Sequence, residues 1–263
     1  MSVSFHDQSL LLGGESLFVR RWQPHTVHGT AIVLLHDSLG SVEQWRDFPA
    51  QLAEHTARPV IAYDRWGFGR SAPRNDTLAP DFIAQEGQIW IPRLTRALQL
   101  QAYVLFGHSV GGSMALHAAA LASRACVGVV TESSQPYIEA KTREGIMQAK
   151  QAFADPAQFA RLEKWHGARA RWVLDAWTET WLSPAFRDWN LTPWLHQVHC
   201  PVLALHGDSD EFGSTAFADH IAEQVSGAAR AVILEHCGHV PHRQYPQQVL
   251  AHVQAFFAAS QVP

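Results

Sequence analysis

The chain has 263 residues, of which 47% are hydrophobic and 17% are charged, a composition typical of a globular protein with a large buried core. Its formal net charge is −4, and neither basic nor acidic residues form a long run. This charge pattern argues against nucleic acid or an anionic membrane surface as a partner.

The N-terminal residues, the lengths of the apolar runs and the cysteines indicate the expected cellular compartment. Residues 1–12 lack a basic stretch followed by an apolar one, so no secretory signal is expected. No apolar run approaches the roughly 20 residues that a membrane span needs. The three cysteines are widely spaced and odd in number, which fits neither a disulfide framework nor a zinc ribbon. The expected location is therefore cytoplasmic.

Short apolar runs alternate with longer amphipathic stretches along the chain. This alternation predicts an α/β fold with a mostly parallel sheet and helices on both faces. The runs 10–12 and 17–19 flank Gly13-Gly14 and predict an antiparallel hairpin at the sheet edge. Six further runs predict strands, namely Ile32–Leu35, Val60–Tyr63, Tyr103–Phe106, Val127–Val130, Val202–Leu205 and Ala231–Leu234.

Helices are expected between these strands. One is predicted to begin at Ser41, with Gln44 completing a capping box. Pro246 opens the last helix, whose apolar positions repeat at helical spacing, namely Val249, Leu250, Val253, Phe256 and Phe257.

Residues 136–198 break the alternation, because no strand-like run occurs there. An insertion of this length is too long for a bare connection. We therefore expect a core domain of residues 1–135 and 199–263, with residues 136–198 forming a helical cap over the carboxyl ends of the strands. The insertion is rich in tryptophan, with Trp165, Trp172, Trp177, Trp181, Trp189 and Trp194.

The strongest chemical signal is the Gly-x-Ser-x-Gly pattern of residues 107–111, centred on Ser109. It directly follows an expected strand and leads into a helical run, which is the setting that a nucleophile elbow requires. Glycines two before and two after the serine remove side chains that would clash in the sharp turn. The alternative is a helix-capping serine beside closely packed glycines, but the context favours a nucleophile.

A serine hydroxyl needs a base within hydrogen-bond reach. His239 is the best candidate, because it lies after the last expected strand and before the last helix, and it is preferred to His236 and His242. The spacing of these three histidines also suggests a metal site. No metal is predicted, because the acidic or thiolate ligands of a zinc site are missing.

The third member of a triad is a carboxylate that orients the imidazole. Asp210 is the candidate, because it follows the strand Val202–Leu205 and lies far enough along the loop to leave the turn. Asp208 in the same loop and Glu132 after the preceding strand are the alternatives. The order Ser109, Asp210, His239 is the order expected of an α/β-hydrolase.

The chain resembles the α/β-hydrolase superfamily, in order and over nearly its whole length. The segments that carry the resemblance are the elbow, the loop 36–41, the segment 64–71, the turn 207–210 and the pair Gly238-His239. The backbone N–H of Val110, directly after the nucleophile, is one expected oxyanion donor. The resemblance implies the N–H of Ser38 as the second. Asp37 departs from the family, which usually has glycine there.

The predicted reaction is hydrolysis of esters or thioesters that carry an apolar part, through an acyl-enzyme on Ser109. It requires neither a metal nor an organic cofactor. Trp66, Phe68, Trp177 and Trp181 are candidates for lining the pocket. The sequence defines neither the acyl length nor the oligomeric state.

Three alternatives remain for this sequence: a carbon–carbon bond hydrolase, a cofactor-free peroxidase of the same fold, and a non-catalytic small-molecule binding protein or receptor. Dehalogenases and epoxide hydrolases of this fold need a carboxylate nucleophile, so the serine at position 109 excludes them.

Overall fold

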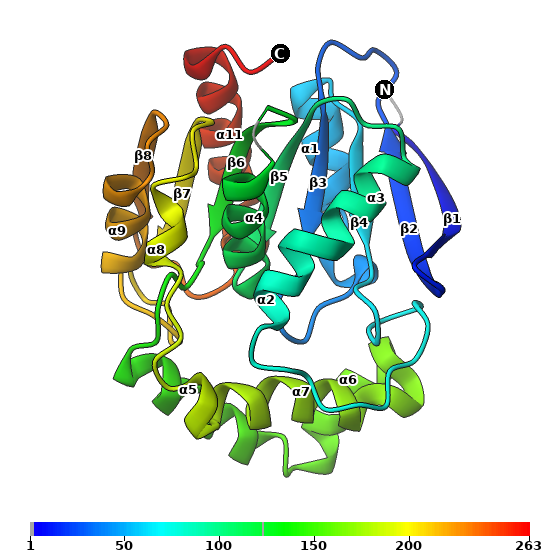
Figure 1. The fold of residues 1–263 in the computed structure, drawn as a ribbon, viewed down its shortest axis with the longest axis vertical. Coiled ribbons are helices and arrows are strands. Elements are labelled where there is room, and N and C mark those ends of the chain that lie inside the picture. The colour runs from blue at the N-terminus through cyan, green and yellow to red at the C-terminus, as the bar shows by residue number, and fades with distance from the viewer. Residues whose placement is uncertain (1–2, 123) are drawn as a thin grey trace.

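A computed structural model describes residues 3–122 and 124–263. The chain forms an eight-stranded sheet in the order β1-β2-β4-β3-β5-β6-β7-β8, in which β2 runs antiparallel to both of its neighbours and the other strands are parallel (Figure 1). The expected α/β class, edge hairpin and six parallel strands are confirmed. The strands are β1 (Ser4–Leu12), β2 (Glu15–Gln23), β3 (Ala31–Leu35), β4 (Val60–Tyr63), β5 (Tyr103–His108), β6 (Cys126–Glu132), β7 (Val202–Gly207) and β8 (Ala229–Leu234).

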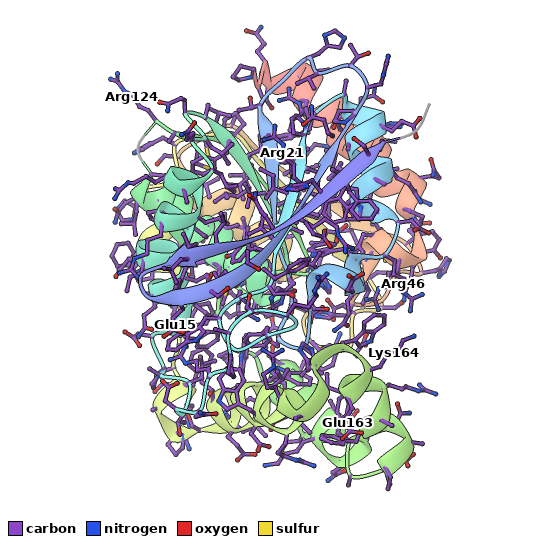
Figure 2. All side chains as sticks on the ribbon, turned by 90° about the vertical axis from the view of Figure 1, so that its right-hand side faces the viewer. Glu15, Arg21, Arg46, Arg124, Glu163 and Lys164 are labelled. Carbon is purple, nitrogen blue, oxygen red and sulfur yellow. The ribbon has the colours of Figure 1, made fainter. Side chains whose placement is uncertain are left out.

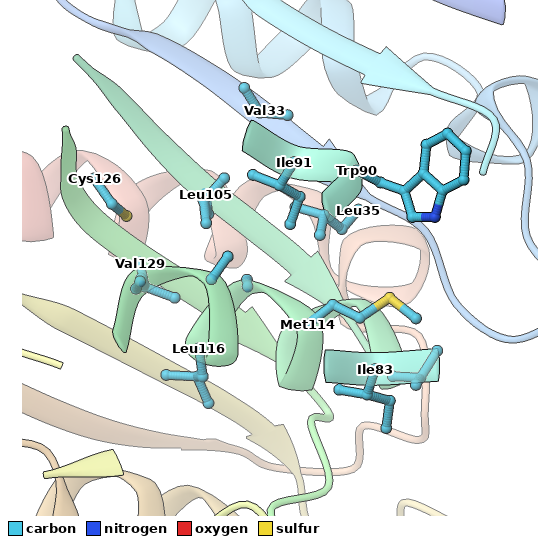
Figure 3. Packing of buried hydrophobic residues seen from close by; sticks show 14 of the residues in the cluster. Val33, Leu35, Ile83, Trp90, Ile91, Leu105, Met114, Leu116, Cys126 and Val129 are labelled. Carbon is cyan, nitrogen blue, oxygen red and sulfur yellow. The ribbon is translucent and has the colours of Figure 1, made fainter. Parts of the chain in front are cut away.

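Helices cover both faces of the sheet because alternate residues of its inner strands are buried on opposite sides. On one face Val33, Leu105 and Val129 pack against residues such as Met114 and Ile91 of the covering helices (Figure 3). These helices are α2 (Phe82–Gln85), α3 (Ile91–Ala97), α4 (Val110–Leu121), α8 (Thr192–Leu195) and α9 (Ala216–Gln224), with a π-helical turn, Glu86–Trp90, between α2 and α3.

The other face carries α1 (Phe48–Thr56) and α11 (Pro246–Ser260). Their apolar residues pack against Ile32, Val104 and Leu203 of the sheet. In α11 the buried positions are the five that the spacing predicted, namely Val249, Leu250, Val253, Phe256 and Phe257.

The helix predicted at Ser41 begins later than expected. Residues Val42–Trp45 form a 3-10 turn, and α1 starts only at Phe48, with proline in its first turn. Ser41 makes no capping bond, and the Gln44 amide instead donates to the Leu39 carbonyl at 2.6 Å. The capping-box prediction was wrong because Gln44 supports the loop after β3 rather than a helix start.

Between β6 and β7 the chain forms a layer of helices across the end of the sheet at which the parallel strands terminate (Figure 1). We refer to α5 (Ala140–Ala152), α6 (Pro156–His166) and α7 (Ala170–Leu182) as the helical layer. In α6, Leu162 is buried while Glu163 and Lys164 are exposed and project from the molecule (Figure 2). Short 3-10 turns, Gly167–Arg169 and Pro184–Phe186, flank α7, and a last short helix, α10 (Pro241–Gln244), precedes α11.

The helical layer is attached to the sheet by polar contacts at the loops after β3 and β4. The Nδ1 of His166 accepts the Gly69 N–H at 3.0 Å, and its Nε2 donates to the Leu39 carbonyl at 2.9 Å. Arg169, in the turn between α6 and α7, also donates to the Gly69 and Ser71 carbonyls of the loop after β4. Gly67, at a φ of +92°, lies against the Trp172 ring, which is 2.6 Å from the point where a Cβ would stand. No described helix is both long and apolar enough to span a membrane.

Candidate active site

Ser109 occupies a sharp turn between β5 and α4, with φ 55° and ψ −127°. A residue with a Cβ reaches positive φ only at an energetic cost, and such strain is concentrated at functional sites. The turn is possible because a Cβ at Gly107 would collide with the Gly111 backbone, and a Cβ at Gly111 with the Leu35 carbonyl. The sequence pattern thus corresponds to the strand–turn–helix geometry that it predicted.

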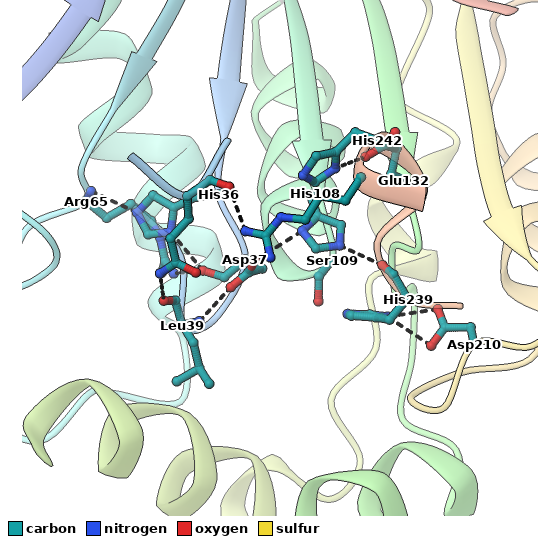
Figure 4. Close-up of polar contacts among 12 residues, drawn as sticks. His36, Asp37, Leu39, Arg65, His108, Ser109, Glu132, Asp210, His239 and His242 are labelled. Carbon is teal, nitrogen blue, oxygen red and sulfur yellow. Dashed lines mark hydrogen bonds and ion pairs between the residues drawn. The ribbon is translucent and has the colours of Figure 1, made fainter. Parts of the chain in front are cut away.

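The candidate base and acid are in direct contact. His239 Nδ1 lies 2.9 Å from Asp210 Oδ1 and 2.8 Å from Oδ2, while Oδ1 also accepts the Phe212 N–H at 2.8 Å (Figure 4). Burial favours a neutral Asp210, but the charge and hydrogen bond of His239 outweigh it and lower the pKa of this carboxyl. The ionised carboxylate therefore fixes the proton on Nδ1 and leaves Nε2 free to accept a proton.

The rival residues lie elsewhere. Asp208 and His236 are exposed, and the carboxylate of Asp208 accepts the neighbouring Ser209 hydroxyl. Glu132 and His242 form a separate buried pair, with Glu132 Oε2 2.6 Å from His242 Nδ1.

Ser109 and His239 line the same cavity, which has a volume of about 230 Å³. In the described part of the chain, the Ser109 hydroxyl accepts a 3.5 Å hydrogen bond from Gln135 Nε2 and makes none with His239. Catalytic hydrogen bonds are often long or misaligned in a free enzyme and tighten when substrate binds. Rotation of the serine side chain would be needed to bring its hydroxyl to the base.

The loop after β3 forms another wall of the cavity through Asp37, Ser38 and Leu39. Asp37 Oδ1 accepts the Leu39 N–H at 2.8 Å, which folds a tight turn around Ser38. Within the described residues, the Ser38 N–H has no hydrogen-bond partner. Val110 is the first residue of α4, where the N–H has no partner within the helix. Neither predicted donor is thus engaged by another described residue.

His36 holds this loop in place. Its Nδ1 donates to the Asp37 carbonyl at 2.8 Å, and its Nε2 accepts the Arg65 N–H at 3.1 Å. Burial, together with the nearby Arg65 charge, lowers the pKa of His36 well below its ordinary value, so the ring is neutral. One neutral tautomer satisfies both contacts.

The remaining cavity wall is largely apolar. Trp177 and Trp181 of α7 line it, as the sequence suggested. Trp66 and Phe68 lie outside it: Trp66 packs against Trp90, while Phe68 is buried between the rings of His36 and Trp172. The sequence reasoning did not identify the other lining residues, which include Gln44, Gln135, Thr142, Ile146, Ala149, Phe153, Phe212 and Val240.

One missed residue had a detectable signal. Phe212 lies two positions after Asp210, and its ring contacts both His239 and Trp177 at centroid distances of 4.8 and 5.7 Å. An aromatic residue so close to a candidate acid could have been proposed from sequence. The contributions of α5 depend on how the helical layer folds back, for which the sequence carries no local signal.

In the described part of the chain, no group of three or more histidine, cysteine, aspartate or glutamate side chains has the arrangement of a metal site. His236 is exposed and His242 is paired with Glu132, so the three histidines at 236, 239 and 242 do not converge.

Comparison with known proteins gives a consistent result. The model of a family described as the alpha/beta hydrolase family matches residues 32–252. The human protein named serine hydrolase BPHL is 28% identical over 219 residues, covering 75% of this chain and 69% of its own. A non-heme chloroperoxidase from Streptomyces lividans is 25% identical over 266 residues, covering 87% of this chain and 90% of its own.

Solved structures show the same fold. The 2-hydroxy-6-oxo-6-phenylhexa-2,4-dienoate hydrolase of Rhodococcus sp. strain RHA1 superposes with a TM-score of 0.80 at 17% sequence identity. The match covers 98% of this chain and 100% of that one.

Proposed function

Because the chain belongs to the alpha/beta hydrolase family, we propose that it is a serine hydrolase that cleaves carboxylic esters or thioesters through an acyl-enzyme on Ser109. The observation that carries the proposal is the contact of both Asp210 oxygens with His239 Nδ1, at the cavity that Ser109 also lines. A histidine held in this tautomer beside a strained serine is the arrangement that activates a hydroxyl.

In the proposed mechanism, Ser109 Oγ attacks the carbonyl carbon while His239 Nε2 takes its proton. The N–H groups of Val110 and Ser38 stabilise the negative charge that develops on the carbonyl oxygen. His239 then returns the proton to the leaving alcohol or thiol. Water attacks the acyl-enzyme by the same route, which releases the acid and restores Ser109.

The cavity lining supports an apolar acyl group. Ile146, Ala149, Phe153, Trp177 and Phe212 form one continuous apolar wall. Among the described residues, no lysine or arginine lines the cavity. A dienoate like the one in the name of the Rhodococcus relative carries a carboxylate, which would meet no lysine or arginine side chain there. The absence of these side chains from the described lining favours neutral esters over carbon–carbon bond hydrolysis of a charged substrate.

We further propose that residues 136–198 act as a cap on a core domain of residues 1–135 and 199–263. The support is that Thr142, Ile146 and Ala149 of α5, together with Trp177 and Trp181 of α7, face the same cavity as Ser109. Substrate selection would then depend on the helical layer, while the chemistry depends on the sheet.

The test is covalent labelling with a fluorophosphonate, which reports an activated serine without knowledge of the substrate. We expect the matching mass on the peptide that contains Ser109, no labelling of Ser109→Ala, and at least a roughly 10³-fold loss of ester turnover in that variant. Ser113→Ala is the matched control, because Ser113 lies in the first turn of α4, directly after the elbow, is buried and does not line the cavity. Labelling that persists in Ser109→Ala would refute the nucleophile, and an unlabelled protein without esterase activity would favour a binding protein.

A further inference from the structure

The side chain of His108 lies at the junction of three loops that the proposed mechanism uses. It directly precedes Ser109 in the elbow, and its side chain is only 2% exposed. Its Nδ1 is 3.2 Å from Asp37 Oδ2, and its Nε2 is 2.7 Å from the backbone carbonyl oxygen of His239 (Figure 4). One ring therefore contacts the loop after β3 and the loop that carries the candidate base.

Both contacts require a hydrogen on the ring. A carboxylate and a carbonyl oxygen are acceptors only, so the two contacts are satisfied together when both ring nitrogens of His108 carry protons. Burial favours a neutral ring, but the hydrogen bond and charge of Asp37, the charge of Glu132 and the His239 carbonyl outweigh it and raise the pKa of His108. Burial likewise favours a neutral Asp37, yet the hydrogen bond and charge of His108 outweigh it and lower the pKa of that carboxyl.

Asp37 transmits this contact to the expected oxyanion donor. While Oδ2 faces His108, Oδ1 accepts the Leu39 N–H, and Ser38 lies between the two residues. The Asp37 carbonyl is also held, since it accepts from His36 Nδ1 and from Arg65 Nη2, each at 2.8 Å. Glycine at position 37 would supply none of the side-chain contacts.

We propose that Asp37 and His108 form a positioning pair, in which a carboxylate and an imidazolium hold the oxyanion loop and the base-bearing loop in register with Ser109. This inference rests on the proposed function, since it concerns how the same site is held. Neither residue exchanges a proton with substrate in this role.

The pair also predicts an upper pH limit for activity. The ionisable groups that face His108 are Asp37, Glu132 from β6, His239, and His242, whose ring centroid lies 5.0 Å away. The imidazolium is present at low pH and is lost as pH rises through its raised pKa, when one ring nitrogen is left with a lone pair that faces either the Asp37 carboxylate or the His239 carbonyl oxygen. Turnover should therefore fall on the alkaline side.

Two substitutions at position 37 separate positioning from charge. Asp37→Ala removes every side-chain contact, and we expect kcat to fall about 10- to 100-fold with KM changed less than about 3-fold, less than the complete loss of an oxyanion donor. Asp37→Asn still accepts the Leu39 N–H, and its amide donates to Nδ1 of a neutral His108. This variant should keep kcat within about 5-fold and lose the alkaline fall.

Glu132→Gln is the matched control, because it weakens a second histidine–carboxylate pair, which is buried and does not contact the oxyanion loop. It should lose less than about 10-fold in kcat and keep the alkaline fall, moved to lower pH because the Glu132 charge helps to raise the pKa of His108. Equal large losses in Asp37→Ala and Asp37→Asn would overturn the positioning role, because the charge itself would then be required. An unchanged kcat in Asp37→Ala would overturn the positioning role as well.

A measurement on the wild-type protein decides the matter even where a variant does not fold. In ¹⁵N NMR of histidine-labelled protein, His108, assigned by its loss in His108→Gln or by through-bond correlation to Ser109, should show two protonated nitrogens at pH 7. A neutral ring would overturn the proposal. Failure of fluorophosphonate labelling in the wild type would instead refute the proposed function, while the NMR result would still report on the pair.

Discussion

Replacement of Asp210 by asparagine tests the candidate triad most directly. Asp210 is buried, and both of its oxygens lie within 2.9 Å of His239 Nδ1. An asparagine keeps the size but has one acceptor oxygen, and that oxygen is also needed by the Phe212 N–H. The amide NH₂ then faces the His239 ring, so Nδ1 must accept a hydrogen bond and the ring proton moves to Nε2. A protonated Nε2 cannot take the proton of Ser109.

The magnitude follows from this change of tautomer. In the serine proteases that define the triad, the same substitution lowers kcat by about 10⁴-fold. We expect at least about 10²-fold here, which corresponds to about 2.7 kcal/mol of lost transition-state stabilisation. The lower bound allows for residual activity from molecules in which the His239 ring adopts the productive tautomer.

The assay is kcat/KM on a p-nitrophenyl ester, with circular dichroism to show that each variant is folded. Asp208→Asn is the first control and should lose less than about 10-fold, because this carboxylate is exposed and contacts the Ser209 hydroxyl. Glu132→Gln is the second and should behave similarly. A large loss of kcat/KM in Asp208→Asn with a small loss in Asp210→Asn would refute the choice of Asp210 as the acid of this loop. A large loss of kcat/KM in Glu132→Gln would instead identify Glu132 of β6 as the acid.

Two further predictions concern the helical layer. Each acyl methylene of an ester should add up to about 0.8 kcal/mol of transition-state stabilisation, measured from kcat/KM, until the cavity of about 230 Å³ is filled. Phe153→Ala should move the acyl length of highest kcat/KM to longer chains. A flat profile from acetate to decanoate would contradict this. Burial lowers the pKa of His166, so the stability that its neutral ring contributes is present above the ordinary pKa of about 6.5 and is lost as pH falls through the lower folded value. Urea unfolding between pH 5 and 8 should therefore give a free energy that rises with pH, and His166→Ala should reduce that rise.

The fold was predictable because its core obeys simple periodicity. Strands such as β3 are buried on both faces and read as continuous apolar runs, and α11 shows its buried face at helical spacing. The start of α1 was not predictable from its capping signal, because Gln44 contacts the Leu39 carbonyl in the preceding loop. A capping motif does not predict a helix start when its side chain forms a hydrogen bond with another part of the structure.

The site was predictable where chain position determines geometry. Strand order places the loops that carry Ser109, Asp210 and His239 at one edge of the sheet, so the three residues could be chosen from neighbouring alternatives. The role of His108 was not predictable in this way. Its partners, Asp37 and the His239 carbonyl, are 71 and 131 residues away along the chain, and their distances depend on the packing of three loops.

The two histidine–carboxylate pairs show why strand position alone does not define a catalytic acid. Strand β6 and the loop after β7 each present a carboxylate to a histidine from the segment after β8. The Glu132–His242 pair is enclosed by Trp45, Phe48 and the His108 ring, and burial lowers the pKa of His242.

His239 differs because it reaches the cavity that Ser109 lines, and its side chain is 11% exposed. A base must exchange protons with substrate and water, so access to the cavity, rather than the strength of the ion pair, supports our proposal that His239 and Asp210 are the catalytic pair. The Glu132–His242 pair has the shorter contact, 2.6 Å, but neither residue lines this cavity. The pair instead connects the segment after β8 to strand β6 of the sheet.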